Sequence, residues 1–433
     1  MREMKDSGIP WLGNYPTNWE LIKIKYCLQD RVEKNNPIRT RQILSLTAKQ
    51  GVIPYDQKEG GGNKPKEDVS AYRLAYPGDI VMNSMNILSG SVGLSQYFGC
   101  VSPVYYMLRP RNKEEDVRYY NYIFQTTVFQ RSLFGLGNGI LIKESSNGNL
   151  NTIRMRIPMD KFGGLFIPVA PIEEQHRIAD FLDQQCSEID SLVADIQSQI
   201  ETLEQYKKSV IFDAISHGIV GAEMTSTDSN IWSNIPNDWS LVDIKYLFEV
   251  VKRMAGKEGF DVLSVTQKGL KIKDISKNEG QVANDYSGYQ FVYPTDYVMN
   301  HMDLLTGWVD CSTQFGVTSP DYRVFRLRDK EKNSLSYYKY VMQCCYMCKI
   351  FYSLGQGVSN LGRWRLQTST FMNFQVPVPP FEEQHRIADY LDQKCSEIDK
   401  VISMKQEQLS VLQEYKKSLI YEYVTGKKEV PNQ

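Results

Sequence analysis

The sequence has little of what catalytic sites are usually built from. Only four histidines occur in 433 residues. Two of them, His176 and His385, lie near predicted helix starts without the paired His or Cys that a metal site needs, which favours capping or interface roles. The sequence contains no G-x-x-x-x-G-K-[ST] loop, no G-x-G-x-x-G fingerprint and no Asn-Pro-Pro-aromatic motif. Nucleotide hydrolysis, dinucleotide binding and amino-methyl transfer by this chain therefore lack support.

Export signals and long apolar runs are also missing. The N-terminus has no signal-peptide pattern, and no apolar run is long enough to cross a bilayer. We therefore expect a cytoplasmic, reduced chain without disulfides. Cys345-x-x-Cys348, next to Cys344, is half of a zinc pattern with no second pair in register. Its helical surroundings favour core packing over metal or redox chemistry.

The most informative feature present is an internal repeat. Glu173 to Asp190 reads EEQHRIADFLDQQCSEID, and Glu382 to Asp399 reads EEQHRIADYLDQKCSEID. The Tyr-Lys-Lys-Ser that begins at Tyr206 also returns, at Tyr415. Chance does not reproduce such a block, so one module was duplicated. Each module has a variable half of about 150 residues, a size that suits one domain, and a nearly fixed half.

The fixed halves predict long helices. Glu173 to Ser216 contains no proline or glycine, and a helix of that length spans about 65 Å. Apolar residues recur every three or four positions, which indicates a heptad seam. The seam residues are Ile178, Leu182, Cys186, Ile189, Val193, Ile196, Ile200, Leu203, Tyr206 and Val210, with Ile387, Leu391, Cys395, Ile398, Ile402, Leu409, Leu412, Tyr415 and Leu419 in the second copy.

An apolar stripe of this kind needs a partner. The simplest partner is the duplicate, paired antiparallel about a pseudo-twofold axis; intermolecular coiled coils are the alternative. Lys405 takes the seam position of Ile196 and is expected to fix the register at some loss of stability. The predicted fold is α+β, with two globular domains separated by two long antiparallel helices that form a coiled coil.

The domain boundaries follow from the repeat and from the Gly, Ser, Thr and Asn content of residues 217–233. We predict a first globular domain over 1–165, a central helical region over 166–217, a linker over 218–233, a second globular domain over 234–375, a C-terminal helical region over 376–426 and a tail over 427–433. Residues 101–108 and 322–327 are predicted strands, and 117–134 and 335–351 are predicted helices.

Charge follows the same division. Residues 1–165 hold 22 basic and 15 acidic side chains, whereas 171–217 hold 3 and 10; residues 230–375 hold 17 and 14, and 380–426 hold 6 and 9. Basic globular parts suit a polyanion, and acidic helices suit a protein partner or simply a solvated face.

Polar loops between the variable and fixed halves are candidate nucleic-acid contacts. Asn and Gln can contact adenine, Arg can contact guanine or phosphate, and flanking glycines allow close approach; an ordinary surface loop and strand is the alternative. The candidates are Lys49, Asn83, Asn138, Arg154 and Arg156 in the first domain and Lys268, Asn300, Gln356, Arg363, Trp364 and Arg365 in the second.

The duplicated block resembles the specificity subunit of type I restriction-modification systems. The resemblance rests on Pro168-Val169-x-Pro171-x-Glu173-Glu174-Gln175-x-Arg177-Ile178-Ala179, on its copy at 377–388, and on Ile9-Pro10-x-Leu12-Gly13 with Pro16-x-x-Trp19. It covers essentially the whole chain. Ala170 stands where the second copy has Pro379, a minor departure.

The resemblance implies a non-catalytic subunit with two target recognition domains, each reading half of a split, asymmetric site on double-stranded DNA. Two methyltransferase subunits, which use S-adenosylmethionine, would dock on the helices, and motor-nuclease subunits would add cleavage. This chain itself would bind no cofactor. Helix length would set the unread spacer, because DNA advances about 34–36 Å per turn. Inserting helical turns after Ile200 should therefore lengthen the spacer.

Identity between the two copies favours a surface used twice by like partners, although residues that only cap and pack the helix pair would also repeat. The predicted docking residues are Gln175, His176, Arg177, Asp180, Gln384, His385, Arg386 and Asp389. Two other readings stay open: a stand-alone nuclease or methyltransferase, which the missing motifs disfavour, and a DNA-free adaptor, which predicts no salt-dependent DNA binding. Within the family, a specificity subunit of a system that methylates and cuts by a different route is a further alternative.

Overall fold

The computed structural model describes residues 2–47, 50–58, 65–87, 90–137, 143–144, 150–151, 156–219, 221–274, 285–357 and 364–431. The chain forms two compact units. Unit 1 is Met1–Ile196 together with Glu407–Gln433, and unit 2 is Gln197–Gln406. Each unit therefore contains one globular domain and a part of each long helix.

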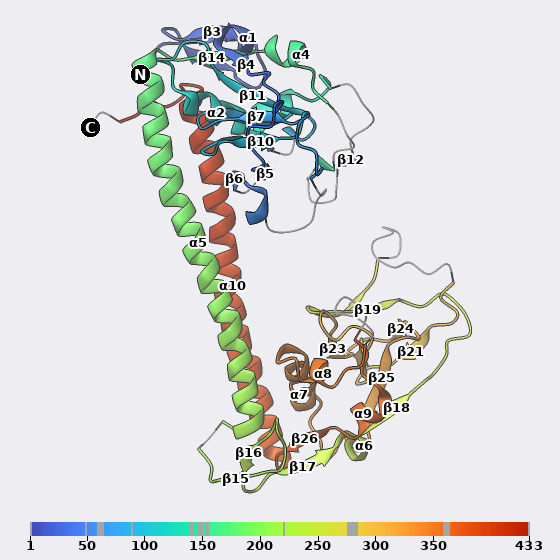
Figure 1. The fold of residues 1–433 in the computed structure, drawn as a ribbon. Coiled ribbons are helices and arrows are strands. Elements are labelled where there is room, and N and C mark those ends of the chain that lie inside the picture. The colour runs from blue at the N-terminus through green and yellow to red at the C-terminus, as the bar shows by residue number, and fades with distance from the viewer. Residues whose placement is uncertain are drawn as a thin grey trace. The chain divides into compact units, whose positions relative to one another are not determined.

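A four-stranded antiparallel sheet forms the centre of unit 1 (Figure 1). Its strand order is β4-β11-β8-β9, and Leu108 of β11 pairs with Asp30 on one side and Ile80 on the other. The sheet strands are β4 (Leu28–Asp30), β11 (Tyr105–Pro110), β8 (Ile80–Asn83) and β9 (Val92–Leu94). β8 is buried along its whole length, which explains its continuous apolar run.

Smaller elements complete unit 1. They are β1 (Met4–Asp6), β2 (Asn14–Pro16), β3 (Glu20–Lys23), α1 (Ile24–Cys27), β5 (Leu44–Thr47), β6 (Gly51–Pro54), η1 (Tyr55–Gln57), β7 (Arg73–Ala75), β10 (Gly99–Val101), α2 (Val117–Gln125), α3 (Thr127–Ser132), β12 (Lys143–Glu144), β13 (Leu150–Asn151), α4 (Met159–Gly163) and β14 (Phe166–Val169). The antiparallel pairs are β1 with β2, β3 with β14, β5 with β6, β7 with β10 and β12 with β13.

Unit 2 repeats this plan. Its sheet has the order β18-β25-β22-β23, formed by β18 (Phe248–Val251), β25 (Arg323–Leu327), β22 (Tyr297–Met299) and β23 (Val309–Cys311). The other elements are β15 (Met224–Ser226), β16 (Asn234–Pro236), β17 (Ser240–Asp243), α6 (Ile244–Leu247), β19 (Leu263–Thr266), β20 (Gly269–Ile272), β21 (Gln290–Val292), β24 (Gly316–Thr318), α7 (Leu335–Met347), α8 (Ile350–Ser353), α9 (Thr368–Met372) and β26 (Gln375–Val378).

The two long helices are α5 (Ile172–His217) and α10 (Phe381–Val424), close to their predicted bounds. In both units they lie side by side and antiparallel, as Figure 1 shows. In unit 1, Lys416 Nζ lies 2.6 Å from Asp190, and the rings of Tyr423 and Phe181 lie 4.6 Å apart. In unit 2, Lys207 Nζ lies 2.6 Å from Asp399. The predicted α+β fold with an antiparallel helical pair is confirmed.

The heptad seam is largely correct, with one duplicated error. Ile178, Leu182 and their copies Ile387 and Leu391 are buried, but Tyr206 is 55% exposed and Tyr415 51%. Each tyrosine precedes a lysine, Lys207 or Lys416, whose side chain is about three-quarters covered and whose ammonium binds the opposite helix. The lysine stem thus takes the interface place predicted for the tyrosine. The Lys405 ammonium donates a hydrogen bond to the Gln199 side-chain carbonyl, so it has a polar partner within the seam.

Equivalent side chains in the two units form hydrogen bonds between each globular domain and the N-terminal part of the long helix that follows it. Trp19 Nε1 donates to Glu174 at 2.9 Å, and Trp239 Nε1 donates to Glu383 at 3.1 Å. The Tyr122 hydroxyl donates to Asp183, and Tyr340 donates to Asp392 in the same way. Indole and phenol donors to a carboxylate are charge-assisted bonds, so they orient the domain firmly on its helix.

The predicted linker is the clearest error in the domain boundaries. Residues 218–233 include β15, which pairs with β16 as β1 pairs with β2. They also place Trp232 in the core, 1% exposed, with its indole donating to the Gln375 carbonyl. The segment is polar in composition but belongs to unit 2, because one large aromatic residue anchors it.

The tail and the domain helices also differ from the prediction. Lys427 Nζ donates to the Leu12 carbonyl at 2.6 Å, so the predicted tail begins packed on the N-terminal segment. The predicted helices 117–134 and 335–351 each break in two, at Thr126 and at Cys348 with Lys349.

Candidate nucleic-acid interface

Arg156 and Arg365 occupy matching exposed positions in the two units. Each precedes a buried residue, Ile157 or Leu366, whose backbone is held at both ends. Ile157 N donates to Ser84 O at 3.0 Å, and Leu366 N donates to His301 O at 3.0 Å.

The other end of the same anchor differs in chemistry. The Tyr106 hydroxyl donates to the Ile157 carbonyl at 2.9 Å, whereas the Arg323 guanidinium donates to the Leu366 carbonyl at 2.9 Å. The two sequences therefore use different side chains to fix the same backbone point, which mounts a solvent-facing arginine on a rigid support in each unit.

Gln356 lies beside Arg365 through an antiparallel backbone bridge. Each residue donates its N–H to the carbonyl of the other at 3.0 Å, and both side chains are exposed. Paired residues of an antiparallel bridge project their side chains to the same face. An amide and a guanidinium are thus presented together, a combination able to contact base edges or phosphate.

Trp364 packs into the domain instead of standing free. It is partly buried, its ring lies 5.2 Å from that of Tyr352, and Gly355 fits closely against it. Only part of its ring is therefore accessible, and its contact with DNA stays a prediction. The indole serves to hold the loop that carries Gln356.

Lys268 is exposed at the tip of the β19–β20 hairpin. Its N–H donates to Thr266 Oγ1 at 3.2 Å, and this hydroxyl donates in turn to Gly269 O at 2.9 Å. The β5–β6 hairpin of unit 1 closes through the corresponding hydroxyl of Thr47. The tip lysine is thus carried on a small, internally bonded turn.

The two candidate asparagines shape turns. Asn83 Oδ1 accepts from Met85 N at 3.0 Å, and Asn300 Oδ1 accepts from Met302 N at 3.3 Å. Asn83 is 8% exposed, so the prediction that it contacts DNA is wrong; its amide stabilises the turn after β8. A shared structural role also explains why the two diverged domains keep an asparagine here.

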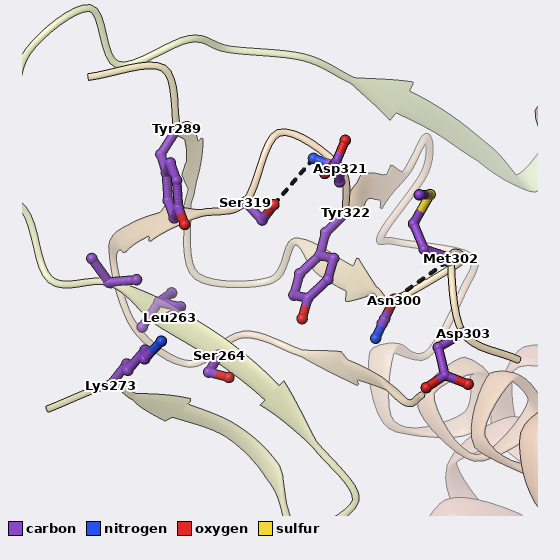
Figure 2. Close-up of a pocket in the computed structure, with 11 residues that line it drawn as sticks. Leu263, Ser264, Lys273, Tyr289, Asn300, Met302, Asp303, Ser319, Asp321 and Tyr322 are labelled. Carbon is purple, nitrogen blue, oxygen red and sulfur yellow. Dashed lines mark hydrogen bonds between the residues drawn. The ribbon is translucent and has the colours of Figure 1, made fainter. Parts of the chain in front are cut away.

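Asn300 differs because it borders a cavity of about 250 Å³ in unit 2. In Figure 2 its amide and the Tyr322 hydroxyl face the side of the cavity formed by β19, which carries Leu263 and Ser264. Burial raises the pKa of the Tyr322 phenol, so it remains a hydrogen-bond donor at neutral pH. The cavity can therefore offer an amide and a phenol to a polar group.

The remaining nucleic-acid candidates, Lys49, Asn138, Arg154 and Arg363, lie outside the described residues.

Two of the eight predicted docking residues are buried. Gln175 and Gln384 are each 1% exposed. Gln384 Nε2 donates to Pro379 O at 3.0 Å, and its Oε1 accepts from Ser334 N at 2.8 Å. Gln175 makes the matching bonds in unit 1. Their prediction as exposed docking residues is wrong, because each bridges the helix start to its own domain.

His176 and Asp180 are also engaged within unit 1. The His176 ring nitrogens lie 2.9 Å from Asp116 Oδ2 and 3.0 Å from Glu114 O, and Arg118 lies 2.8 Å from Asp180. The Arg118 hydrogen bonds and charge outweigh burial and lower the pKa of Asp116. The other four docking candidates, Arg177, His385, Arg386 and Asp389, have exposed side chains.

Exposed apolar side chains on the two long helices repeat with the same spacing. Leu192 is 52% exposed and its copy Val401 41%, while Tyr206 and Tyr415 are each about half exposed. The Lys416–Asp190 pair places Tyr415 level with Leu192, and the Lys207–Asp399 pair places Tyr206 level with Val401. Each unit thus carries the same uncovered patch, which the repeat of 209 residues could have revealed.

Metal ligation and membrane insertion receive no support. Within the described residues, no group of three or more His, Cys, Asp or Glu side chains is placed to hold a metal ion. No helix in the described part of the chain is long and apolar enough to span a membrane.

Comparison with known proteins agrees with this architecture. The model of the type I restriction modification DNA specificity domain matches residues 236–410, which cover most of the second copy. Two curated relatives from Methanocaldococcus jannaschii, the specificity subunit of type I restriction enzyme MjaVIII and the putative one of MjaX, are each 23% identical. The matches cover 96% of this chain and 94% or 95% of the relatives.

A solved structure shares the fold of the whole chain. It comes from work on complex assembly and conformational transition of a type I R-M system and superposes with a TM-score of 0.68 at 12% identity, covering 96% of this chain and 99% of the other. The chain is thus similar over nearly its whole length to type I restriction enzyme specificity subunits, and its second copy matches the type I DNA specificity domain.

Proposed function

We propose that the chain is the non-catalytic subunit that selects the DNA sequence for a type I restriction-modification complex. Each globular domain reads one half of a bipartite, asymmetric site on double-stranded DNA, and the helices set the unread spacer. The complex works in the cytoplasm with two methyltransferase subunits that use S-adenosylmethionine and methylate adenine. Motor-nuclease subunits join it for restriction.

One observation carries the reading role. Arg156 and Arg365 are exposed at equivalent, rigidly anchored positions of two domains that otherwise differ in sequence. Guanidinium groups bind guanine edges and phosphates, and a rigid mount makes such contacts selective. The neighbours of the two arginines differ, so the two half sites differ as well.

The test is methylome sequencing of cells that express this chain with its methyltransferase. A split adenine-methylated motif should appear only when the chain is present. Arg156→Ala should weaken or relax one half of that motif and Arg365→Ala the other, by about 1–3 kcal/mol of discrimination if the arginine contacts a base. Lys332→Ala is the control, since Lys332 is 83% exposed and far from either arginine in sequence. Absence of any new motif despite a stable complex would support an adaptor instead.

The spacer role has its own experiment. Insertion of helical turns after Ile200 in α5, with matching turns in α10, should lengthen the unread gap while leaving both half sites unchanged. An unaltered gap in the methylated sites of this variant would show that the helices do not set the length of the spacer.

We propose the repeated patches of Leu192 with Tyr415, and of Val401 with Tyr206, as the centres of the two methyltransferase docks, with Arg177, Arg386 and Asp389 as candidate polar contacts. Large exposed apolar groups on a polar helix suit a protein partner, and a patch present twice suits two like partners.

Charge inserted into one dock should remove one methyltransferase. Leu192→Glu or Val401→Glu should reduce the complex from two methyltransferase subunits to one, measured by light scattering or native mass spectrometry. Ser403→Glu, an exposed change near Val401 on α10, should keep both. Retention of both subunits by the double Glu variant would place the docks elsewhere.

A further inference from the structure

Helix α7 of unit 2 ends at a pair of cysteines that the reading function does not use. Cys344 is fully buried in α7, and Cys348, the residue that follows the helix, is exposed. Their sulfur atoms lie 3.8 Å apart. The next residue, Lys349, has a left-handed backbone (φ +57°), so the chain has left the helix at this point.

The surroundings distinguish Cys348 from the other cysteines of the chain. The hydrogen bond with Cys344 and the charge of Lys208, from α5 in the same unit, lower the pKa of the Cys348 thiol to about 7. Of the eight cysteines, all of which the structure describes, the other seven have raised pKa values. Burial is the main cause for six of them, and for Cys344 the hydrogen bond with Cys348 comes first.

The geometry also permits the two sulfurs to join. Side chains four residues apart on a helix have Cβ atoms about 5–6 Å apart, and a disulfide brings its Cβ atoms to about 4 Å and its sulfurs to about 2.05 Å. The sulfurs must therefore approach by less than 2 Å from their 3.8 Å separation. Cys348 is the C-terminal cap of α7: its N–H donates to the Cys344 carbonyl at 2.9 Å, and the helix ends directly after it at Lys349.

Unit 1 builds the equivalent helices without cysteine. The corresponding helices α2 and α3 of unit 1 contain no cysteine, yet they pack into the same kind of core. A requirement for packing therefore does not explain an exposed thiol beside a buried one.

We propose that Cys348 is a site of reversible covalent oxidation by hydroperoxides, with Cys344 as the resolving thiol. The Cys348 thiolate attacks the terminal peroxide oxygen; an S–O bond forms and the O–O bond breaks. The other oxygen leaves as hydroxide from hydrogen peroxide, or as alkoxide from an organic hydroperoxide, and is protonated to water or an alcohol. The Cys344 sulfur then attacks the Cys348 sulfenic acid. An S–S bond forms, the S–O bond breaks, and the Cys344 proton leaves with the hydroxyl group as water. A small thiol in excess reverses the change by thiol–disulfide exchange and is itself oxidised.

Competitive alkylation of the full-length chain tests the first step. With limiting iodoacetamide at pH 7, Cys348 should be labelled about ten-fold faster than any other cysteine, because it alone is both exposed and lowered in pKa. Tryptic peptides identify the site by mass spectrometry. Equal, slow labelling of all eight cysteines would overturn the proposal without any need for a variant.

Peroxide treatment tests the second step. The peptide Tyr340 to Lys349 should lose two hydrogen atoms, and a small thiol should restore its mass. Cys348→Ser should abolish both the fast labelling and the loss. Cys344→Ala removes the hydrogen bond that lowers the pKa of Cys348, so labelling should slow, and oxidation should stop at a sulfenic acid that a 1,3-diketone traps. Cys345→Ala should behave as the wild type. A disulfide that persists in Cys348→Ser, or that disappears in Cys345→Ala, would contradict the assigned pair.

Discussion

Replacing Gln384 separates a structural role from a docking role at the start of α10. Alanine at this position leaves two buried backbone groups without partners, the N–H of Ser334 and the carbonyl of Pro379. Each unsatisfied buried group costs about 1–3 kcal/mol, and relaxation around the smaller side chain recovers part of this. We therefore expect Gln384→Ala to destabilise unit 2 by about 2–4 kcal/mol. Ser334 is the N-cap residue of α7, so the loss should reach the core of the domain.

The assay is thermal unfolding followed by calorimetry. A change of 1 kcal/mol lowers the melting temperature of a domain of about 200 residues by about 2–4 °C, so the unit 2 transition should fall by about 4–16 °C. Arg386→Ala, an exposed change two positions further along α10, should stay within about 0.5 kcal/mol of the wild type. It should instead weaken methyltransferase binding if it belongs to the dock.

The equivalent change in unit 1, Gln175→Ala, breaks the bonds to Asp116 N and Ala170 O and should lower the other transition. Because the two sites lie in separate units, their effects should add in the double variant. An unchanged melting temperature of Gln384→Ala, together with loss of methyltransferase binding, would refute the structural assignment and restore the docking one.

Two further predictions concern unit 2. Burial and the charges of Arg323 and Arg365 lower the pKa of His301 to about 4, below its ordinary value of 6.5. As the pH falls, the unfolded chain therefore takes up the proton before the folded chain does. The free energy of unfolding should decrease between pH 6.5 and pH 4 by on the order of 2 kcal/mol. Urea titrations at pH 7 and pH 4.5 check this, and His301→Gln should flatten the difference; an equal slope in that variant would assign it to other groups. Thr295 has a left-handed backbone (φ +76°) at the place where unit 1 has Gly78. Thr295→Gly should relieve about 1 kcal/mol of backbone strain and so raise the melting temperature of unit 2. Gly78→Thr should add about 1 kcal/mol of strain and lower the melting temperature of unit 1. Thr295→Ala, which keeps the Cβ but loses the hydroxyl bonded to Lys330, is the control and should not reproduce the gain.

The repeat allowed much of the fold to be predicted from the sequence. A two-copy block with an uninterrupted heptad stripe requires long helices, and burial of that stripe requires a partner of the same kind. The sequence alone did not show that residues 218–233 carry a strand, because that strand consists of only three residues, all of them exposed. The segment is instead anchored to unit 2 by the buried side chain of Trp232. Short strands with polar faces leave almost no periodic signal.

The candidate site was harder to predict because exposure depends on tertiary contacts. Identity between the copies predicts a shared partner surface, yet Gln175 and Gln384 are identical because both make the same buried hydrogen bonds. The same ambiguity affects Asn83 and Asn300, which are turn residues. Duplication marks what two units have in common, and most of that is how each unit is built.

The core of unit 1 is built from segments that are translated at different times. This core joins Leu12 and Trp19 to Leu419, Ile420 and Val424 of α10, so segments far apart in the sequence form the two sides of one core. Unit 2 is contiguous in sequence and can complete its core while the last residues are still being made. The N-terminal domain, translated first, has to wait with an open apolar face until residue 424 emerges, and it is the part of the nascent chain that most needs a chaperone.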